Sequence, residues 1–252
     1  MDVKKDKPLQ MAQVLEIRHL YKSFGNNHVL LDFNLEIKKG ESVVVLGKSG
    51  SGKSVLIKCI IGLLKPDKGS IEMFGENIPD IKDEELDKIR AKVGFLFQSN
   101  ALYDSMTVRE NLEFPLRRHW IQVSQDEVNT MVKEALEDVG LAHTIDMMPA
   151  ELSGGMRKRI ALARTLILNP EIILYDEPTT GLDPITSKEI IGLMTEIQGK
   201  YNTTSLIISH DMNCVRMASN RIVILVDGKC YANGTYEQLK ENMDPKVKQF
   251  FE

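Results

Sequence analysis

The sequence has no long hydrophobic run. Its longest apolar stretches, at 43–46, 172–175 and 222–226, have the length of a β-strand, whereas a membrane-spanning helix needs about 20 apolar residues. Residues 1–8 are mostly charged and no apolar segment follows them, so we expect no signal peptide at this end. If the protein acts at a membrane, we therefore expect it to act as a peripheral partner.

Cysteine and basic charge are also in short supply. The three cysteines are odd in number and lack CxxC spacing, which indicates neither a disulfide framework nor a zinc site and favours a reduced, cytosolic protein. Lys and Arg total 32 against 36 Asp and Glu, a net charge of −4. Because nucleic-acid-binding proteins usually present a basic face, we do not expect nucleic acid as a partner.

The rest of the composition is that of an ordinary globular chain, with 42% hydrophobic and 27% charged residues. Residues 1–12 form a polar tail, and the alternating apolar pattern over 14–37, with a turn at 25–27, predicts antiparallel strands. The short apolar segment 42–46 is typical of a strand buried on both faces of a parallel sheet. We then expect a helix at 53–64, strands at 71–74 and 93–97, and a charged helix at 83–92.

The middle of the chain, from 99 to 152, shows no convincing strand. Ser124 and Glu127 match a capping box before an amphipathic helix, which Gly140 is placed to end. Further on, helices are expected at 157–168 and 185–200, strands at 172–175, 204–209 and 222–226, and a short helix before the last strand. Strands that alternate with helices predict a mostly parallel sheet with helices on both faces.

Residues 47–54 match the spacing GxxxxGK[ST] of a phosphate-binding loop. Glycines let successive backbone N–H groups curve around a phosphate, and the following helix presents its positive end to the same anion. A strand before the motif and an apolar helix after it make a plain surface turn the weaker interpretation. Lys53 is placed to reach the β- and γ-phosphates and Ser54 to ligate Mg²⁺. The residues expected to bind nucleotide here are Gly47, Lys48, Ser49, Gly50, Ser51, Gly52, Lys53, Ser54 and Val55.

Two carboxylates, Asp176 and Glu177, follow the apolar strand 172–175. The carboxyl end of a buried parallel strand faces the ligand crevice of an open α/β sheet. Beside a phosphate-binding loop, Asp176 is placed to hold Mg²⁺ and Glu177 to act as general base or orient the attacking water, an effect of about 10²–10⁴-fold. Taken alone, Asp-Glu-Pro after a strand is more often a solvated turn.

A second glycine-led helix begins at Ser153, Gly154 and Gly155. Its backbone N–H groups and positive end could receive a phosphate, as in the first loop. By itself, this pattern is more often a simple helix cap. Its meaning therefore depends on the other motifs of the chain.

Several motifs occur in a fixed order. They are the phosphate-binding loop, Gln98 at the end of a strand, LSGG at 152–155, the strand that leads to Asp176, GLDP at 181–184 and His210 at the end of a strand. Together they resemble the ATP-binding subunit of an ABC transporter over about 14–237. The resemblance implies that the chain binds and hydrolyses ATP with Mg²⁺ and drives a membrane permease as a homodimer.

The resemblance also implies a role for each matching residue. Gln98 would contact Mg²⁺ or the attacking water and report to the permease, and His210 would contact the γ-phosphate. Ser153, Gly154 and Gly155 would contact the γ-phosphate of ATP held by the other subunit, and Asp183 would lie at the dimer interface. The implied catalytic residues are thus Glu177, His210, Lys53 and Gln98. The implied metal ligands are Ser54, Gln98 and Asp176.

Two positions qualify this resemblance. Phe24 matches the aromatic residue that stacks on adenine, although a core or surface aromatic residue remains an open alternative. Met156 replaces the commoner glutamine of the LSGGQ motif. Because the backbone and Ser153 would bind the anion, this change is not expected to abolish activity.

The segments 97–103, 114–117, 183–186 and 244–251, together with LSGGM, resemble the ATPase of Mla, or mammalian-cell-entry, type phospholipid transporters. This implies phospholipid transport, a lipid-binding mammalian-cell-entry type partner, and a peripheral position on the cytoplasmic face of the inner membrane. Leu102, Tyr103 and Met106 would form an apolar groove for the permease. The alternatives are another small-solute ABC transporter, a soluble ABC ATPase outside transport, and a nucleotide-gated scaffold without turnover.

We therefore expect a P-loop NTPase fold of the α/β class. It should combine a mostly parallel sheet, an antiparallel N-terminal β subdomain and a helical insert. The expected bounds are a polar tail at 1–12, the nucleotide-binding domain at 13–240 with its helical subdomain at about 99–155, and a short C-terminal tail at 241–252.

Overall fold

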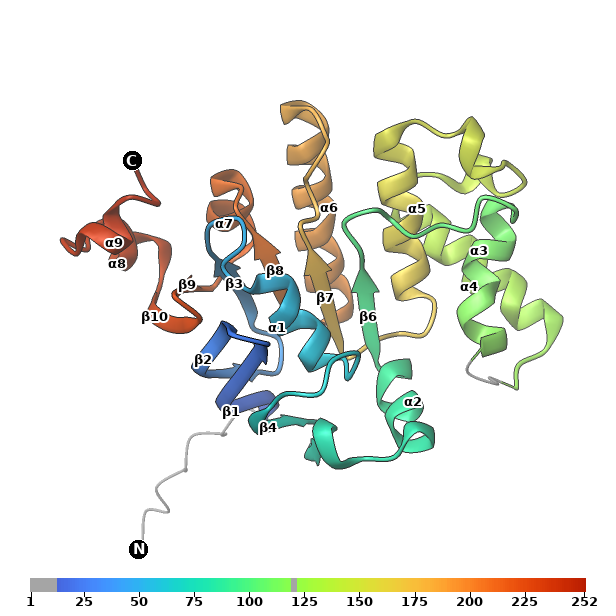
Figure 1. The fold of residues 1–252 in the computed structure, drawn as a ribbon. Coiled ribbons are helices and arrows are strands. Elements are labelled where there is room, and N and C mark those ends of the chain that lie inside the picture. Colours follow the sequence, from blue (N-terminus) through green and yellow to red (C-terminus); the bar gives the residue numbers. More distant parts are fainter. Residues whose placement is uncertain (1–12, 119–121) are drawn as a thin grey trace, which may run out of the picture.

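The computed structural model describes residues 13–118 and 122–252. The polar tail expected at 1–12 lies outside the described residues. The fold has two sheets, one antiparallel and one mostly parallel, and most helices lie about the parallel sheet (Figure 1). The expected α/β class and the mostly parallel sheet are confirmed.

The antiparallel sheet holds the N-terminal strands in the order β2-β1-β4-β5. They are β1 (Gln13–Phe24), β2 (Asn27–Lys38), β4 (Lys68–Met73) and β5 (Glu76–Asn77). The expected turn joins β1 to β2, and Gly25 there has a φ of +58°, which glycine adopts without steric cost. The alternating pattern of 14–37 therefore forms the predicted antiparallel pair.

The central sheet has the order β10-β9-β3-β8-β7-β6. Its strands are β3 (Ser42–Leu46), β6 (Val93–Leu96), β7 (Ile172–Asp176), β8 (Thr204–Ser209), β9 (Arg221–Val226) and β10 (Lys229–Gly234). All pair in parallel except the edge strand β10. Because parallel strands run the same way, their carboxyl ends meet at one edge of the sheet, where the functional motifs follow β3, β7 and β8.

The two faces of the central sheet pack into two cores. Val43 and Val45 of β3 contribute to the core shared with the antiparallel sheet, whereas Val44 and Leu46 contribute to the other, as the alternation of side chains along a strand requires. The first core includes α1 (Lys53–Ile60), and the second includes α5 (Gly154–Leu166), α6 (Pro184–Tyr201) and α7 (Met212–Ala218). The central sheet thus lies between two layers.

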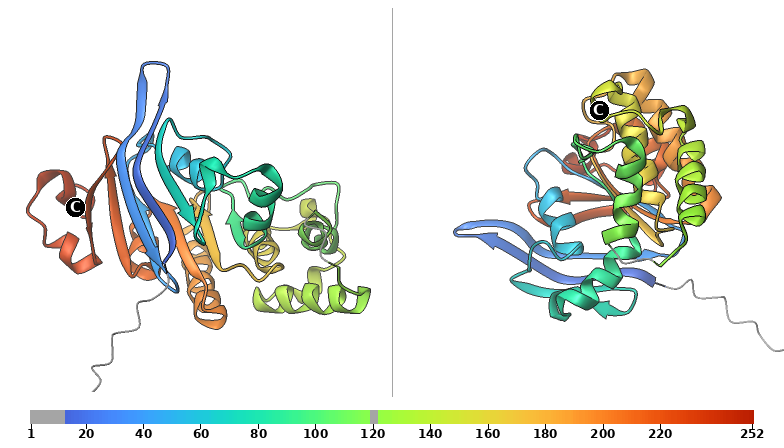
Figure 2. Two further views of the ribbon diagram at one scale, coloured as in Figure 1. Left: turned by 90° about the horizontal axis from the view of Figure 1, so that it is seen from below. Right: turned by 90° about the vertical axis from the view of Figure 1, so that its right-hand side faces the viewer.

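The described part of 99–152 contains helices and no strand. These are α3 (Val108–Arg118) and α4 (Gln125–Asp138), with the 3₁₀ helices η2 (Ala142–Thr144) and η3 (Pro149–Glu151). The predicted capping box of Ser124 and Glu127 is present at the start of α4. In both views of Figure 2, the hairpin of β1 and β2 extends away from α3 and α4.

Several elements differ from the expectations. The helix predicted at 53–64 ends at Ile60, because the chain turns at Gly62, whose φ is +71°. The helix predicted at 157–168 begins three residues earlier, at Gly154, because the Ser153 side chain caps it. The charged helix predicted at 83–92 is α2 (Asp83–Ala91), preceded by η1 (Ile78–Asp80).

The last part of the chain folds more than the sequence indicated. Strand β10 is followed by α8 (Tyr236–Lys240) and α9 (Pro245–Lys248). β10 reads Lys-Cys-Tyr-Ala-Asn-Gly, and Asn and Gly are depleted in strands, which weakens its signal. Within 13–118 and 122–252, no helix has both the length and the apolar character to cross a membrane.

Candidate nucleotide-binding site

The phosphate-binding loop joins the end of β3, at Leu46, to the start of α1, at Lys53. Gly50 and Gly52 have φ angles of +78° and +103°. A Cβ on Gly52 would lie 2.9 Å from Cγ1 of Val29 and 3.0 Å from its carbonyl oxygen. Both the backbone conformation and the contact with β2 therefore require glycine at this position.

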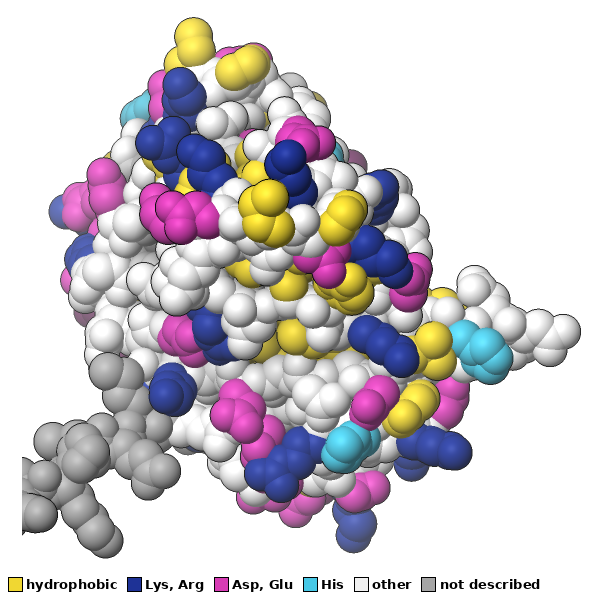
Figure 3. Space-filling model, turned by 90° about the vertical axis from the view of Figure 1, so that its left-hand side faces the viewer, with side chains coloured by type: hydrophobic (Ala, Val, Ile, Leu, Met, Phe, Trp, Pro, Cys, Tyr) yellow, Lys and Arg dark blue, Asp and Glu magenta, His cyan; other side chains and the backbone are white. Residues whose placement is uncertain are grey.

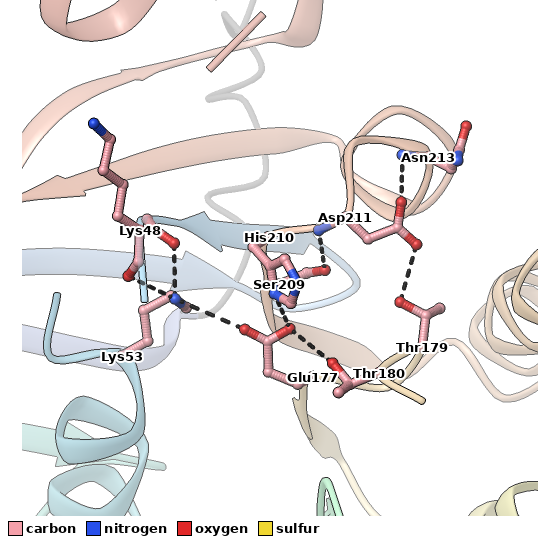
Figure 4. A network of polar contacts seen from close by, with 10 residues as sticks. Lys48, Lys53, Glu177, Thr179, Thr180, Ser209, His210, Asp211 and Asn213 are labelled. Carbon is pink, nitrogen blue, oxygen red and sulfur yellow. Dashed lines mark hydrogen bonds and ion pairs between the residues drawn. The ribbon is translucent and has the colours of Figure 1, made fainter. Parts of the chain in front are cut away.

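Lys53 holds a fixed position within the loop. It is 7% exposed, and its Nζ donates to the carbonyl oxygens of Gly47 at 2.7 Å and Lys48 at 3.1 Å. The same Nζ lies 3.7 Å from Oε1 of Glu177 (Figure 4). The contacts with Gly47, Lys48 and Glu177 hold the buried positive charge of Lys53 between the loop and the end of β7.

Glu177 is the centre of the polar network in Figure 4. Its φ is +51°, a left-handed conformation that is uncommon outside glycine and clusters at functional sites. Its Oε2 lies 2.7 Å from Nδ1 of His210 and accepts a 3.4 Å hydrogen bond from the Thr180 hydroxyl. The Glu177 carboxylate thus has Lys53 at one oxygen and His210 at the other. Glu177 follows β7, Lys53 comes after β3 and His210 follows β8.

Asp176 ends β7, next to Glu177. Its Oδ1 is buried and has no hydrogen-bond partner among the described residues. Burial raises the pKa of the Asp176 carboxyl group above its ordinary value, and the neighbouring Glu177 carboxylate raises it further. A cation at this position would offset both effects.

The oxygens around this position fit Mg²⁺. The hydroxyl of Ser54 and the amide of Gln98 belong to residues that line the adjoining cavity, and Asp176 supplies the carboxylate. Mg²⁺ prefers oxygen ligands and commonly combines one or two carboxylates with substrate phosphates. The donor set of this chain therefore matches the metal expected from the sequence.

Most of the predicted nucleotide-binding residues line one cavity of about 870 Å³, which we call the nucleotide cavity. Its volume is within the range of about 300–1,000 Å³ typical of small-molecule sites. Phe24, 48% exposed at the end of β1, is one of these residues. The predicted residues in its lining are Phe24, Gly47, Lys48, Ser49, Gly50, Gly52, Lys53, Ser54, Val55, Gln98, Glu177 and His210. Ser51 lines an adjoining cavity that shares residues 48–50.

Ser153, Gly154, Gly155 and Asp183 are brought together elsewhere. They line a separate cavity of about 420 Å³ between the starts of α5 and α6, and it shares no lining residue with the nucleotide cavity. A Cβ on Gly155 would lie 2.8 Å from Cγ2 of Thr186, so close packing of the two helices requires this glycine. One chain therefore presents two distinct glycine-led helix ends.

Asp183 caps α6 by accepting hydrogen bonds from the backbone N–H groups of Ile185 and Thr186, each at 3.0 Å. A hydrogen bond from the Thr186 hydroxyl is the main reason that the pKa of Asp183 is lowered. Its carboxylate is thus held in place by α6 beside the loop of Ser153.

The structure adds residues that the sequence reasoning missed. Thr180 bonds Glu177, and Gln249 and Phe250 of the C-terminal segment line the nucleotide cavity. The Gln249 side chain accepts a 2.7 Å hydrogen bond from Nζ of Lys48. No motif at 249–250 indicates this contact, because it depends on how α9 packs back onto the chain. Only the Thr180 contact had a local signal, since it follows Glu177 by three residues.

Lys158 is the other missed residue. It lies on α5 and is 1% exposed, although lysine is rarely buried completely. Its Nζ donates to the carbonyl oxygens of Gln98 at 3.0 Å and Phe97 at 3.4 Å. Burial lowers the pKa of Lys158 to about 8.

A further cavity, of about 440 Å³, lies beside the segment 97–103. Its lining includes Phe97, Tyr103 and Phe114 with the basic residues Arg118 and Arg164. The rings of Tyr103 and Phe114 are 4.6 Å apart between centroids, and the Arg164 guanidinium lies 6.0 Å from the Tyr103 ring. We call these five residues the aromatic groove.

The expected membership of this groove is corrected in part. Of Leu102, Tyr103 and Met106, only Tyr103 lines it. Leu102 instead packs against the core to which α5, α6 and α7 contribute. Asn100 and Ala101 have positive φ angles, so the backbone before Leu102 is irregular. For this reason Leu102, Tyr103 and Met106 do not lie on one shared face.

The fold and the nucleotide cavity define a P-loop nucleotide-binding protein. A family profile described as "ABC transporter" matches residues 30–180. Over 97% of this chain and 70% of its own length, the "Probable ribonucleotide transport ATP-binding protein mkl" of Mycobacterium leprae is 40% identical. The "Intermembrane phospholipid transport system ATP-binding protein MlaF" of Haemophilus influenzae is 38% identical over 94% of this chain and 89% of its own length.

A solved structure agrees with these sequence relationships. The dimeric ATP-binding cassette MJ0796, in a post-hydrolysis state bound to ADP and Pi, superposes with a TM-score of 0.80 at 35% identity, covering 88% of this chain and 98% of that one. The chain therefore belongs to the ABC transporter family. It is the ATP-hydrolysing subunit of such a transporter, a class of cassette that dimerises and works with membrane permeases.

Proposed function

We propose that ATP is hydrolysed where Lys53, Glu177 and His210 converge, and that the reaction drives phospholipid movement by a membrane permease. The observation that carries the first half is the position of Glu177, 3.7 Å from Nζ of Lys53 and 2.7 Å from Nδ1 of His210. A carboxylate beside the phosphate loop can accept a proton from the attacking water or orient it. Lys53 compensates the charge of the β- and γ-phosphates, and His210 contacts the γ-phosphate.

The remaining residues of the cavity bind and orient the substrate. The backbone N–H groups of 47–55 enclose the phosphates, and the Phe24 ring stacks on adenine at the end of β1. Ser54, Gln98 and Asp176 hold Mg²⁺, which when bound neutralises phosphate charge. The buried Oδ1 of Asp176, which has no hydrogen-bond partner within 13–118 and 122–252, supports this assignment.

Two chains complete each site. Ser153, Gly154 and Gly155 present an N-terminal helix end in a cavity separate from the nucleotide cavity of the same chain. In a homodimer, this end faces the γ-phosphate of ATP on the other subunit, with Asp183 at the interface. The dimeric state of the related cassette supports this arrangement.

The cargo is phospholipid in this proposal. It rests on the relationship to MlaF, whose name describes intermembrane phospholipid transport, and on the segments 97–103, 114–117 and 244–251 noted above. The relative from M. leprae is named for a different cargo, since the ATP site supplies work and the permease selects what is moved. The remaining partner is a lipid-binding mammalian-cell-entry type protein, and the chain lies peripherally on the cytoplasmic face of the inner membrane.

We assign the nucleotide-binding domain to 13–240, its helical subdomain to about 99–155 and a short tail to 241–252. The aromatic groove lies at the border of the helical subdomain, where Gln98 leads into 99–103. The cavity that contains the aromatic groove is lined by three arginines, Arg90, Arg118 and Arg164, and it suits a permease segment that carries both apolar and acidic groups. Binding there would move the segment that also carries Gln98.

The proposal is tested with the tagged full-length chain, purified from detergent-solubilised membranes together with its partners. We expect a permease and a lipid-binding protein to co-purify, and Tyr103→Glu to weaken permease binding by at least about 30-fold because a charge enters the centre of the groove. ATP binding should be unchanged. Met243→Glu is the matched control, because Met243 is 82% exposed between α8 and α9. Exposed hydrophobic side chains of this kind lie among charged ones on the face shown in Figure 3.

Two outcomes would contradict parts of the proposal. Recovery of a permease with a binding protein for a soluble solute, with unchanged envelope lipids on deletion, would reject phospholipid as cargo. Equal permease binding by the Tyr103→Glu and Met243→Glu variants would reject the groove as the docking surface. In either case, the assignment of the chain as an ATPase would stand.

A further inference from the structure

Lys158 is a buried charge that the proposed hydrolysis does not use. It is 1% exposed on α5, the helix that begins at Ser153. A buried ammonium is strongly unfavourable unless it is paired and hydrogen-bonded, and an apolar side chain of similar size would fill the same space without that cost. The contacts of the ammonium therefore indicate what the charge does.

The first contacts are two carbonyl oxygens in the chain leaving β6. Nζ of Lys158 donates to Gln98 at 3.0 Å and to Phe97 at 3.4 Å. Since α5 lies beside β6 (Figure 1), the side chain bridges from the helix to the backbone that carries the Gln98 side chain. These bonds hold the backbone of Gln98, a residue that lines the nucleotide cavity.

Lys158 also experiences the charge of Asp176, which raises the pKa of Lys158 against the larger lowering by burial. Lys158 and Asp176 attract each other, and Asp176 is the carboxylate whose Oδ1 lacks a partner among the described residues. The ammonium is therefore hydrogen-bonded to the backbone of Gln98 and attracted by the charge of Asp176, two of the three residues assigned to the metal. Its position is fixed by α5, whose first residues form the cavity that faces the other subunit.

We propose that Lys158 is a positioning residue that ties α5 to the Gln98 segment, so that the Ser153 end of one helix and the Gln98 side of the nucleotide cavity are held in one arrangement. This inference rests on the proposed function of both ends. Lys158 itself touches no substrate. Its effect is to set where the Gln98 amide lies when ATP is bound.

Arg164 and Lys158 hold different parts of the segment 97–101. Also on α5, Arg164 donates to the carbonyl oxygens of Ala101 at 2.7 Å and Asn100 at 2.9 Å. It therefore holds the part of the segment that faces the aromatic groove. Lys158 holds the part that faces ATP, so α5 fixes the segment at two points with different neighbours.

The test compares Lys158→Met with Lys158→Arg in the tagged full-length chain, purified with its co-purifying permease. Methionine keeps the bulk and removes the donors, and arginine keeps donors and charge. Because a small misplacement of a positioned group can cost about 10²-fold, we expect Lys158→Met to lower kcat by at least about tenfold, with KM for ATP changed less than about threefold. Lys158→Arg should recover most of the loss.

Three controls separate positioning from packing and from surface charge. Leu162→Ala removes buried apolar volume from the same helix and should lower thermal stability without the split between kcat and KM. Lys133→Met changes an exposed lysine on α4 and should leave kcat unchanged. Lys158→Gln, a shorter and neutral donor, gives a second reading if the methionine variant does not fold, and we expect it to lower kcat as well.

A wild-type kcat in Lys158→Met, or in Lys158→Gln where methionine does not fold, would overturn the inference. An arginine variant as slow as the methionine variant, or a Leu162→Ala variant with the same kinetic split, would overturn it too. These results are distinct from a failure of the proposed function. That function fails if Glu177→Gln, measured in the same complex, turns over ATP at the wild-type rate.

Discussion

The starts of α1 and α5, the two glycine-led helix ends described above, differ in what surrounds them. The start of α1 is enclosed, with Lys53 buried between backbone carbonyls and the Glu177 carboxylate. The start of α5 is open, and Ser153 there accepts a 3.2 Å hydrogen bond from the backbone N–H of Met156. Both ends suit a phosphate, but only the first has a carboxylate and a histidine in contact with each other.

The charged groups at the second end join α5 to α6 or cap α6. Arg159 pairs with Glu189 at 2.7 Å, and Asp183 caps α6. The groups with a place in hydrolysis are therefore gathered at the first end, while the second offers recognition of a phosphate. Under the proposed function, each chain carries two unequal halves of a site, and the first predictions test the half assigned to the chemistry.

The largest effect is expected from Glu177→Gln. The amide keeps the shape of the side chain but cannot accept the proton of the attacking water, so kcat should fall by about 10²–10⁴-fold while ATP still binds. Rates of phosphate release and binding of a fluorescent ATP analogue measure the two effects separately. Glu171→Gln is the matched control, because Glu171 lies at the other end of β7, in a surface pair with Lys92. Comparable rates in the two variants would contradict the catalytic role of Glu177, and with it the proposed chemical difference between the starts of α1 and α5.

Lys53→Ala is expected to lower kcat by about 10²–10³-fold, because the charge that stabilises the transferred phosphoryl group is lost. Unlike Glu177→Gln, it should also weaken nucleotide binding, since the ammonium contacts ground-state phosphates as well. Lys65→Ala, an exposed change just beyond α1, should match the wild-type protein in both assays. Normal turnover by purified Lys53→Ala would reject the phosphate-binding role of the first helix end.

The parts of this site that the sequence predicts are those encoded by local spacing. A loop such as 47–54 needs glycine where φ is positive or a neighbour is close, as Gly50 and Gly52 show. Likewise, Asp176 and Glu177 follow an apolar strand, and parallel strands bring their ends to one edge. The mostly parallel sheet and the two glycine-led helices could therefore be predicted without coordinates.

The parts that could not be predicted depend on packing between distant segments. Lys158 reaches Gln98 only because α5 packs beside β6, and a lysine within a helix carries no signal that it is buried. Gln249 reaches Lys48 across the whole chain, from a segment whose elements are short. Leu102 packs against the core, and not in the aromatic groove, because the backbone at Asn100 and Ala101 has positive φ angles. In each case the missing information is tertiary.

The central claim, that two chains complete each site, is tested most directly with mixed dimers. Ser153→Arg damages the open end, Lys53→Ala damages the enclosed end, and Glu177→Gln in both chains keeps bound ATP from being hydrolysed. Ser153→Asn is the control because asparagine also caps helices.

The two chains carry different tags, so that mixed dimers can be isolated and their bound ATP counted. In a mixed dimer, the intact ends of the two chains meet at one site only. We predict one trapped ATP per mixed dimer and none in a dimer of either single variant, with full occupancy for Ser153→Asn. Full occupancy in Ser153→Arg homodimers, or none in the mixed dimers, would contradict the account.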